Sequence, residues 1–190
     1  MIRSLLATAA LATAALGAQA QSTTYAIDPN HTSATFEAMH FGTSTNRGRF
    51  TKTSGTVVID RTAKTAKVDI TLDMTGIMTG VANFDKHLSG PDFFDVANHP
   101  TARFVGEKVV FDGNKLSEVS GELTLRGKSA PITLKAVRFN CFDHPMLKRE
   151  VCGGDFEATI KRSLHDVNWG LKMGAADETR VVIQAEAIKQ

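Results

Sequence analysis

The stretch KVDITLDM, residues 67–74, alternates strictly between polar and apolar side chains, with every even-numbered residue from Val68 to Met74 apolar. Successive side chains of a β-strand point to opposite faces of a sheet, so this period of two predicts a strand with one dry and one wet face. The same alternation recurs at residues 119–126, 132–136, 156–161 and 181–187. A predominantly β-protein is therefore the first expectation.

Weaker strand patterns and turns account for most of the remaining chain. Further strands are predicted at residues 24–28, 33–41, 50–60 and 101–111. DGN at 112–114 and GKSAP at 127–131 predict tight turns, and strands joined by tight turns run antiparallel. Residues 79–88 have the one-sided apolar stripe of a short helix, which Ser-Gly-Pro at 89–91 ends. Residues 164–169 form a second short excursion, between the last two strands.

Eight or nine antiparallel strands with one dry face must bury that face. A two-sheet sandwich and a sheet closed into a barrel both achieve this, and closure also removes the exposed edges. The interior of an eight-stranded barrel is either filled by side chains or able to hold one small ligand. Medium-sized residues dominate the dry face, which favours a cavity. The prediction is one all-β domain, an eight-stranded antiparallel, lipocalin-like barrel with one short helix and a hydrophobic cavity.

The composition excludes several classes of protein. The chain has 190 residues, 42% of them hydrophobic, and 22 basic against 20 acidic side chains. It is too apolar and too evenly charged to be disordered, and it lacks the basic excess that nucleic-acid binding usually requires.

The first twenty residues are typical of a secretory signal peptide. Arg3 precedes an apolar run at 5–16, and Ala18 and Ala20 form an A-x-A cleavage pattern. This run is too short to cross a hydrocarbon core about 30 Å thick, so no stable membrane insertion is expected. Removal of residues 1–20 leaves a domain at 21–190, whose net charge is +1 because Arg3 is lost. Export predicts a periplasmic protein.

Export also decides between two interpretations of Cys141 and Cys152. Two cysteines in an oxidising compartment usually form a disulfide, and closing so short a loop stabilises the fold by about 2–3 kcal/mol. A metal site would recruit His144, but this spacing matches no known zinc motif. We therefore predict the disulfide, with the residues between the two cysteines forming a surface excursion.

No catalytic or metal-binding constellation stands out. The six histidines show neither H-x-x-x-H nor H-E-x-x-H spacing, and there is no G-x-S-x-G nucleophile motif. Asp92 and Asp95 are interpreted as capping residues. Arg47-Gly48-Arg49 beside Phe50 is either the start of a twisted strand or a clamp for a polar headgroup at a barrel mouth. These observations favour a binding role without catalysis, a metal or a cofactor.

Several motifs resemble the YceI-like family, the bacterial polyisoprenoid-binding, lipocalin-like proteins. They are YAIDPNHTSATF at 25–36, RGRF at 47–50, HLSGPDFFDV at 87–96, His99-Pro100-Thr101 with Phe104, GELTLRG at 121–127 with Pro131, and Arg162-Ser163. The most specific of these is PDFFD at 91–95. The chain departs from the family in the apolar residues Val81, Ala82 and Phe84, in the Cys141–Cys152 insert, and in the spacing at 164–169.

The resemblance implies an eight-stranded barrel whose elongated cavity holds an isoprenoid or similar fatty lipid. Related members are periplasmic and are linked to isoprenoid-quinone handling or stress responses. Some join the domain to a membrane cytochrome, which implies a redox partner at a membrane. A homodimer through an exposed strand is a further expectation.

The alternation and the motifs together predict the site residues. The residues predicted to face the ligand are Phe36, Val68, Ile70, Leu72, Met74, Phe104, Leu123, Leu125, Leu134, Phe156, Ile160 and Ile183. Phe84, Phe93 and Phe94 are predicted to close one end. The candidates for the mouth or for headgroup contact are His31, Arg47, Arg49, Asp92 and His99.

Three functions remain open at this point. The first is binding, transport or storage of a polyisoprenoid or isoprenoid quinone, which burial of about 0.8 kcal/mol per CH₂ makes favourable with few polar contacts. The second is an enzyme acting on such a lipid through His31, Asp92 or His99. The third is an interaction module with a filled core.

Overall fold

The computed structural model describes residues 22–190, so the predicted signal peptide at 1–20 lies outside the described residues. The strands are β1 (Thr23–Ile27), β2 (Ser33–His40), β3 (Ser44–Phe50), β4 (Thr53–Asp60), β5 (Thr65–Asp73), β6 (Thr101–Asp112), β7 (Lys115–Leu125), β8 (Lys128–Asp143), β9 (Glu150–Lys161) and β10 (Glu178–Lys189). Between them lie the helix α1 (Ala82–Ser89) and the 3₁₀ turns η1 (Met74–Gly76), η2 (Arg162–His165) and η3 (Leu171–Met173).

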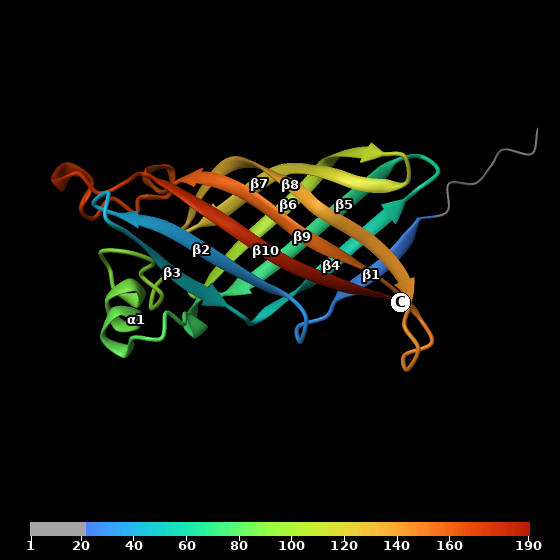
Figure 1. Cartoon of the computed structure of the whole chain (residues 1–190), viewed down its shortest axis with the longest axis horizontal. Coiled ribbons are helices and arrows are strands. Elements are labelled where there is room, and N and C mark those ends of the chain that lie inside the picture. Colours follow the sequence, from blue (N-terminus) through green and yellow to red (C-terminus); the bar gives the residue numbers. More distant parts are fainter. Residues whose placement is uncertain (1–21) are drawn as a thin grey trace, which may run out of the picture.

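The strands close into one antiparallel barrel (Figure 1). β10 pairs with β9 along one edge, while its other edge pairs with β2 at residues 179–184 and with β1 at 187–189. β3 and β4 lie beside β2 and β1 in the same way. Two long strands are therefore each interrupted once, and the closed barrel has eight strands, as the sequence predicts.

The predicted strand at 50–60 is wrong at its start. The structure has two strands here, and Phe50 ends β3 rather than beginning β4. The alternation of β3 is hidden in the sequence because its inward position at Gly48 carries no side chain. The ring of Phe36 occupies the space where a Cβ of residue 48 would lie.

The predicted helix at 79–88 is shifted, because α1 spans Ala82–Ser89. Gly80 has a φ of +86°, a left-handed conformation that cannot continue into a right-handed helix. Asp85 instead accepts hydrogen bonds from the amide and the hydroxyl of Thr79, which fold residues 79–81 against the helix. Among the described residues, no helix is long and apolar enough to cross a membrane.

Two bulges change which residues face the interior. The register of β6 shifts between Gly106 and Lys108, and that of β8 shifts between Ala136 and Arg138. Val137, at the second bulge, is 65% exposed, whereas Phe139 beyond it packs into the core. Counting in steps of two from the inward residues Ile132, Leu134 and Ala136 places both Val137 and Phe139 on the outer face, so the strict period is correct for Val137 and fails for Phe139.

The barrel has two different ends (Figure 1). At one end lie α1, the turn between β2 and β3, and the segment at 162–177 that holds η2 and η3. This segment is longer than the excursion predicted at 164–169. At the other end lie the β8–β9 hairpin and the C-terminus.

Candidate ligand-binding cavity

The barrel encloses a cavity of about 450 Å³ lined mainly by apolar side chains. This volume falls within the range of about 300–1,000 Å³ that is typical of small-molecule sites. The lining includes every residue predicted to face a ligand or to close an end: Phe36, Val68, Ile70, Leu72, Met74, Phe84, Phe93, Phe94, Phe104, Leu123, Leu125, Leu134, Phe156, Ile160 and Ile183. Their contact with a lipid stays a prediction.

Further lining residues escaped the sequence analysis. Val57 and Ile59 line the cavity from β4, where three successive apolar residues at 57–59 leave the inward face undetermined. Phe139 lies beyond the bulge of β8. Trp169 comes from the segment between η2 and η3, where no periodic pattern indicates a direction.

Aromatic side chains close much of the end that carries α1. The ring of Phe94 lies edge-on to Phe36 and Phe50, with centroid separations of 6.1 and 5.6 Å. Such edge-to-face pairs are favourable beyond the area that they bury. The segment after α1 is therefore packed into the barrel end by its aromatic residues.

A second aromatic group lies beside the first. His87 and Phe93 contact each other at 4.9 Å between ring centroids, and both contact Trp169, at 5.2 and 5.4 Å. All three line the cavity. This group joins α1 to the segment at 162–177, two parts of the chain that are far apart in sequence.

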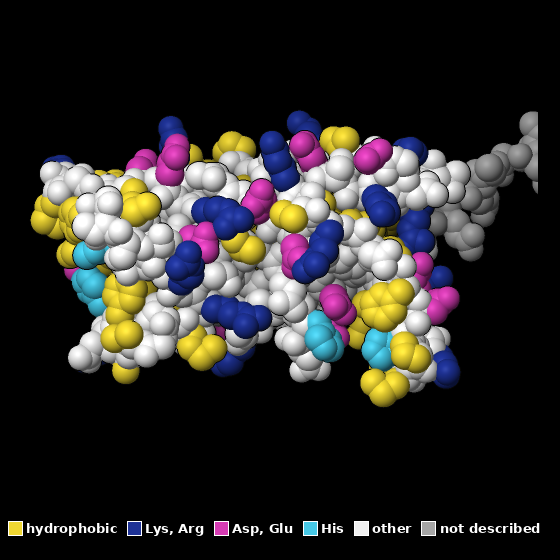
Figure 2. Space-filling view, viewed as in Figure 1, with side chains coloured by type: hydrophobic (Ala, Val, Ile, Leu, Met, Phe, Trp, Pro, Cys, Tyr) yellow, Lys and Arg dark blue, Asp and Glu magenta, His cyan; other side chains and the backbone are white. Residues whose placement is uncertain are grey.

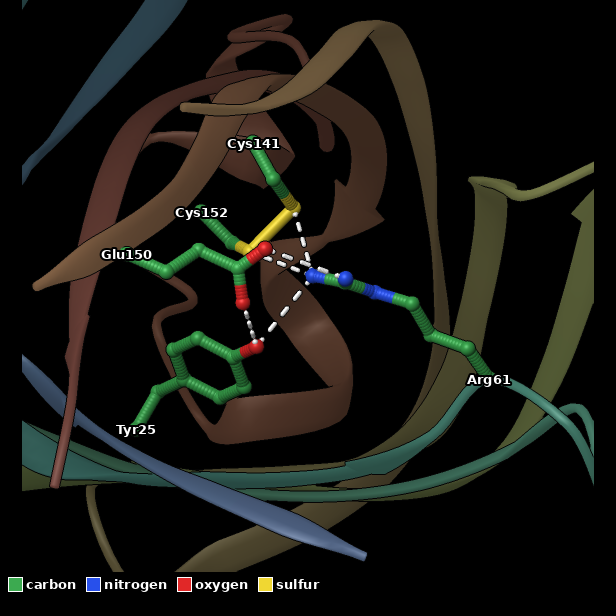
Figure 3. Close-up of a disulfide and its surroundings, with 5 residues drawn as sticks. All are labelled: Tyr25, Arg61, Cys141, Glu150 and Cys152. Carbon is green, nitrogen blue, oxygen red and sulfur yellow. Dashed lines mark hydrogen bonds and ion pairs between the residues drawn. A yellow bond between two sulfur atoms is a disulfide. The ribbon is translucent and has the colours of Figure 1, made fainter. Parts of the chain in front are cut away.

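The opposite end is crossed by a polar cluster built around the disulfide (Figure 3). Cys141 and Cys152 are bonded, which confirms the predicted disulfide, and they are directly paired residues of β8 and β9 with Cα atoms 4.0 Å apart. Arg61, from the turn after β4, donates to both sulfur atoms at 3.0 and 2.9 Å. Because β4 and β8 lie on opposite sides of the barrel, Arg61 spans it.

The surface excursion predicted between the two cysteines is confined to the tip of the β8–β9 hairpin. Only the tip at 144–149 extends beyond the strands, and Cys152 is buried and lines the cavity. The sequence did not reveal that the cysteines lie within strands, because the alternating pattern covers only 132–136 of β8 and 156–161 of β9.

Tyr25 and Glu150 complete the cluster. The Tyr25 hydroxyl donates to Glu150 Oε1, and Arg61 Nη1 donates to Glu150 Oε2 at 3.1 Å. Burial opposes ionisation of Glu150, but the hydrogen bonds from Tyr25 and Arg61 outweigh it and lower the pKa of that carboxyl. Burial, with the bond to Glu150, raises the pKa of Tyr25 from 10.0 to about 12.

This raised pKa gives a direct prediction, because Tyr25 is the only tyrosine in the chain. An absorbance titration of tyrosinate should have its midpoint near pH 12 in the folded protein and near pH 10 in denaturant. The folded pKa exceeds the unfolded one, so the stability that protonated Tyr25 contributes is complete below pH 10 and is lost as the pH rises through 12. A midpoint near 10 without denaturant would contradict the buried position of this hydroxyl.

The five candidates for the mouth or headgroup do not line the cavity. Arg47 and Arg49 point outward from β3, where Glu37 accepts from Arg47 and Ser33 from Arg49, both at 2.8 Å. Their neighbours Gly48 and Phe50 take the buried positions of this strand. Asp92 and His99 belong to the segment around and after α1, and the His99 Nε2 atom lies 4.0 Å from an Asp95 oxygen.

His31 is an ion-pair residue at the surface. Its Nδ1 lies 2.7 Å from Asp28 Oδ2, and the hydrogen bond that the ring donates to the Asp28 carboxylate raises the His31 pKa. Burial alone would raise the pKa of Asp28. The hydrogen bonds that it accepts from His31 and the Asn30 amide outweigh this effect and lower the pKa. Asp28, His31 and Glu186 are near enough together to bind a metal ion. The close Asp28–His31 contact is, however, typical of a structural ion pair. The enzyme hypothesis is not supported by His31, Asp92 or His99, because none of the three lines the cavity.

Comparisons with known proteins agree on one family. A family model described as the YceI-like domain matches residues 25–187. Among curated relatives, Protein YceI of Escherichia coli O157:H7 is 34% identical over 170 residues, covering 87% of each chain. A UPF0312 protein of Pseudomonas savastanoi pv. phaseolicola is 39% identical over 140 residues, covering 72% of this chain and 73% of the relative.

Solved structures show the same fold. BcnA of Burkholderia cenocepacia has a TM-score of 0.68 at 23% identity, covering 85% of this chain and 99% of that one. A polyisoprenoid binding domain from Saccharophagus degradans has a TM-score of 0.60 at 13% identity, covering 87% and 98%. Both similarities show that the barrel has the same overall fold as these two proteins.

Proposed function

Because the chain belongs to the YceI-like family, we propose that it binds one long apolar lipid, a polyisoprenoid or an isoprenoid quinone, in the barrel interior. The proposed role is transport or storage in the periplasm, without catalysis and with no cofactor besides the lipid. The observation that carries the proposal is the cavity of about 450 Å³ with its predominantly apolar lining. The name of the Saccharophagus degradans structure, a polyisoprenoid binding domain, supports the choice of ligand class.

The physics of this cavity suits a hydrocarbon chain. Each buried CH₂ contributes about 0.8 kcal/mol before the entropic costs of ordering, so a long chain binds with few directed contacts. Polar groups are sparse along the middle of the barrel, where Val68, Phe104 and Phe156 form one apolar cluster. Selection among lipids would therefore depend on chain length and on groups near the ends.

Organic extraction of the purified full-length product, followed by mass spectrometry, tests the proposal. We expect an intact long-chain lipid that is enriched over a control protein purified from the same cells. A folded protein with no extractable lipid and no uptake of added isoprenoid would contradict lipid binding and would support the filled-core interaction module instead.

The enzyme hypothesis makes a different prediction in the same assay. It requires a chemically altered lipid after incubation, and Asp92→Ala should then stop the change. An unaltered lipid after prolonged incubation would leave binding as the function. Periplasmic location, a homodimer and a redox partner at the membrane stay predictions, which cell fractionation and measurement of mass in solution can test.

A further inference from the structure

Large apolar side chains are exposed around the end of the barrel that carries α1. Three segments supply them, and we define these side chains as the apolar rim: Met39 and Phe41 beside the β2–β3 turn, Val81 before α1, and Leu164, Trp169 and Met173 around η2 and η3. Val81 is 58% exposed and Met173 is 62% exposed. Figure 2 shows hydrophobic side chains at this end of the molecule, and others at the opposite end.

The apolar rim is continuous with the cavity. Met39, Phe41 and Trp169 are both exposed and part of the cavity lining. Trp169 also contacts His87 edge-to-face and Phe93 in a tilted arrangement, and both of these residues line the cavity. An apolar path therefore runs from solvent into the interior at this end, whereas Arg61, Glu150 and Tyr25 lie across the other end.

One of the three segments of the rim, at 162–177, is braced by polar contacts. Arg162 donates to the carbonyls of Ala176 and Val167 at 2.8 and 2.9 Å, and Asp177 accepts from the amide and hydroxyl of Ser163. These bonds tie together the two ends of the segment at 162–177. Its apolar side chains are thus presented on a braced loop, although burial would normally be favoured.

The charges around the rim favour an anionic surface modestly. Lys86 of α1 and Lys172 of η3 have no carboxylate partner within 4.0 Å in the described part of the chain. Asp166, by contrast, pairs with Lys128 at 3.6 Å. Asp92 stays exposed on the same end, so apolar contact must supply most of any attraction.

We propose that the apolar rim docks the protein on the surface of a phospholipid bilayer. The cavity then opens onto the phase from which a water-insoluble ligand is taken, or to which it is released. A side-chain set with Trp, Phe, Leu and Met on one face and lysines among them matches the chemistry of a membrane interface, where aromatic rings and cations are favoured. The inference rests on the proposed lipid-binding function and adds the partner that supplies the ligand.

Trp169 makes the test specific, because it is the only tryptophan in the chain. The purified full-length protein is titrated with vesicles of phosphatidylethanolamine and phosphatidylglycerol. Binding is measured by sedimentation and by the fluorescence emission of Trp169. We expect co-sedimentation, a blue shift, and quenching by lipids brominated in their acyl chains. The Leu164→Asp/Met173→Asp variant should bind vesicles about tenfold more weakly or worse, because it loses apolar area that would enter the bilayer. Neither residue lines the cavity, so the substitutions leave the proposed ligand site intact.

The β8–β9 hairpin provides a matched control at the opposite end. Met146 and Leu147 are also exposed, Met146 at 82%, so Met146→Asp/Leu147→Asp makes the same chemical change away from the rim. This variant should bind vesicles like the unmodified protein. Equal loss in both variants, or no vesicle binding by the unmodified protein, would overturn the proposal, as would attachment only to bilayers that contain a membrane protein.

Extraction of lipid from the same preparations separates this inference from the proposed function. If the protein contains lipid but does not bind vesicles, the docking proposal is wrong and the proposed lipid binding still holds. Protein that contains no lipid and accepts none removes both.

Discussion

A Leu123→Arg variant should fold and purify without lipid. Leu123 lines the cavity from β7, in register with Phe104 on β6 and Ala130 on β8. A guanidinium at this position would lose its hydration when a hydrocarbon chain enters, at a cost of about 3 kcal/mol or more. The affinity for lipid should then fall by roughly a hundredfold, which extraction and mass spectrometry can measure.

The neighbouring residue supplies the control for this substitution. Glu122 is exposed on the outer face of the same strand, so Glu122→Arg places the same side chain outside the barrel and should leave the lipid content unchanged. If Leu123→Arg fails to fold, Leu123→Trp reduces the cavity without adding charge and should also lower the lipid content. Normal lipid content in a folded Leu123→Arg protein would show that the ligand lies elsewhere.

Loss of the disulfide should lower the stability of the fold and leave the lipid content nearly unchanged. Cys141 and Cys152 join β8 to β9 where Arg61 crosses the barrel, and removing the bond releases a loop of ten intervening residues. The chain-entropy model gives a loss of about 2–3 kcal/mol. For a protein of this size, that corresponds to a fall in melting temperature of roughly 4–12 °C.

Cys141→Ala/Cys152→Ala tests this expectation by thermal unfolding, with reductant as an independent way to break the same bond. The unmodified protein under reducing conditions should melt close to the double variant, and reductant should not change the variant further. An unchanged melting temperature in both experiments would show that β8 and β9 are held as firmly by their ladder and by Arg61 alone.

The parts of the site that sequence analysis could predict are those governed by local alternation. Val68, Ile70 and Leu72 lie on one face of β5 because a strand must place them there, whatever its neighbours are. The Pro-Asp-Phe-Phe-Asp run at 91–95 marked the aromatic closure, although its contact with Phe36 and Phe50 depends on the assembled barrel.

The parts that escaped prediction have no local signal. Arg61 lies in a turn with no pattern around it, and its partners Glu150 and Cys152 are about ninety residues away. Phe139 changes faces at a bulge that the alternation does not reveal. Trp169 reaches the cavity from a loop whose two ends are joined by hydrogen bonds of Arg162 and Asp177.

The sequence by itself determined that this protein is a β-domain with one apolar face, because the period of two acts within each strand. Tertiary structure alone decided how two interrupted strands close the barrel and which further residues, such as Phe139 and Trp169, line its interior. It also decided that one end is crossed by Arg61 while the other exposes an apolar rim. The physical reason is that closure, bulges and cross-barrel contacts depend on residues that only the folded chain brings together.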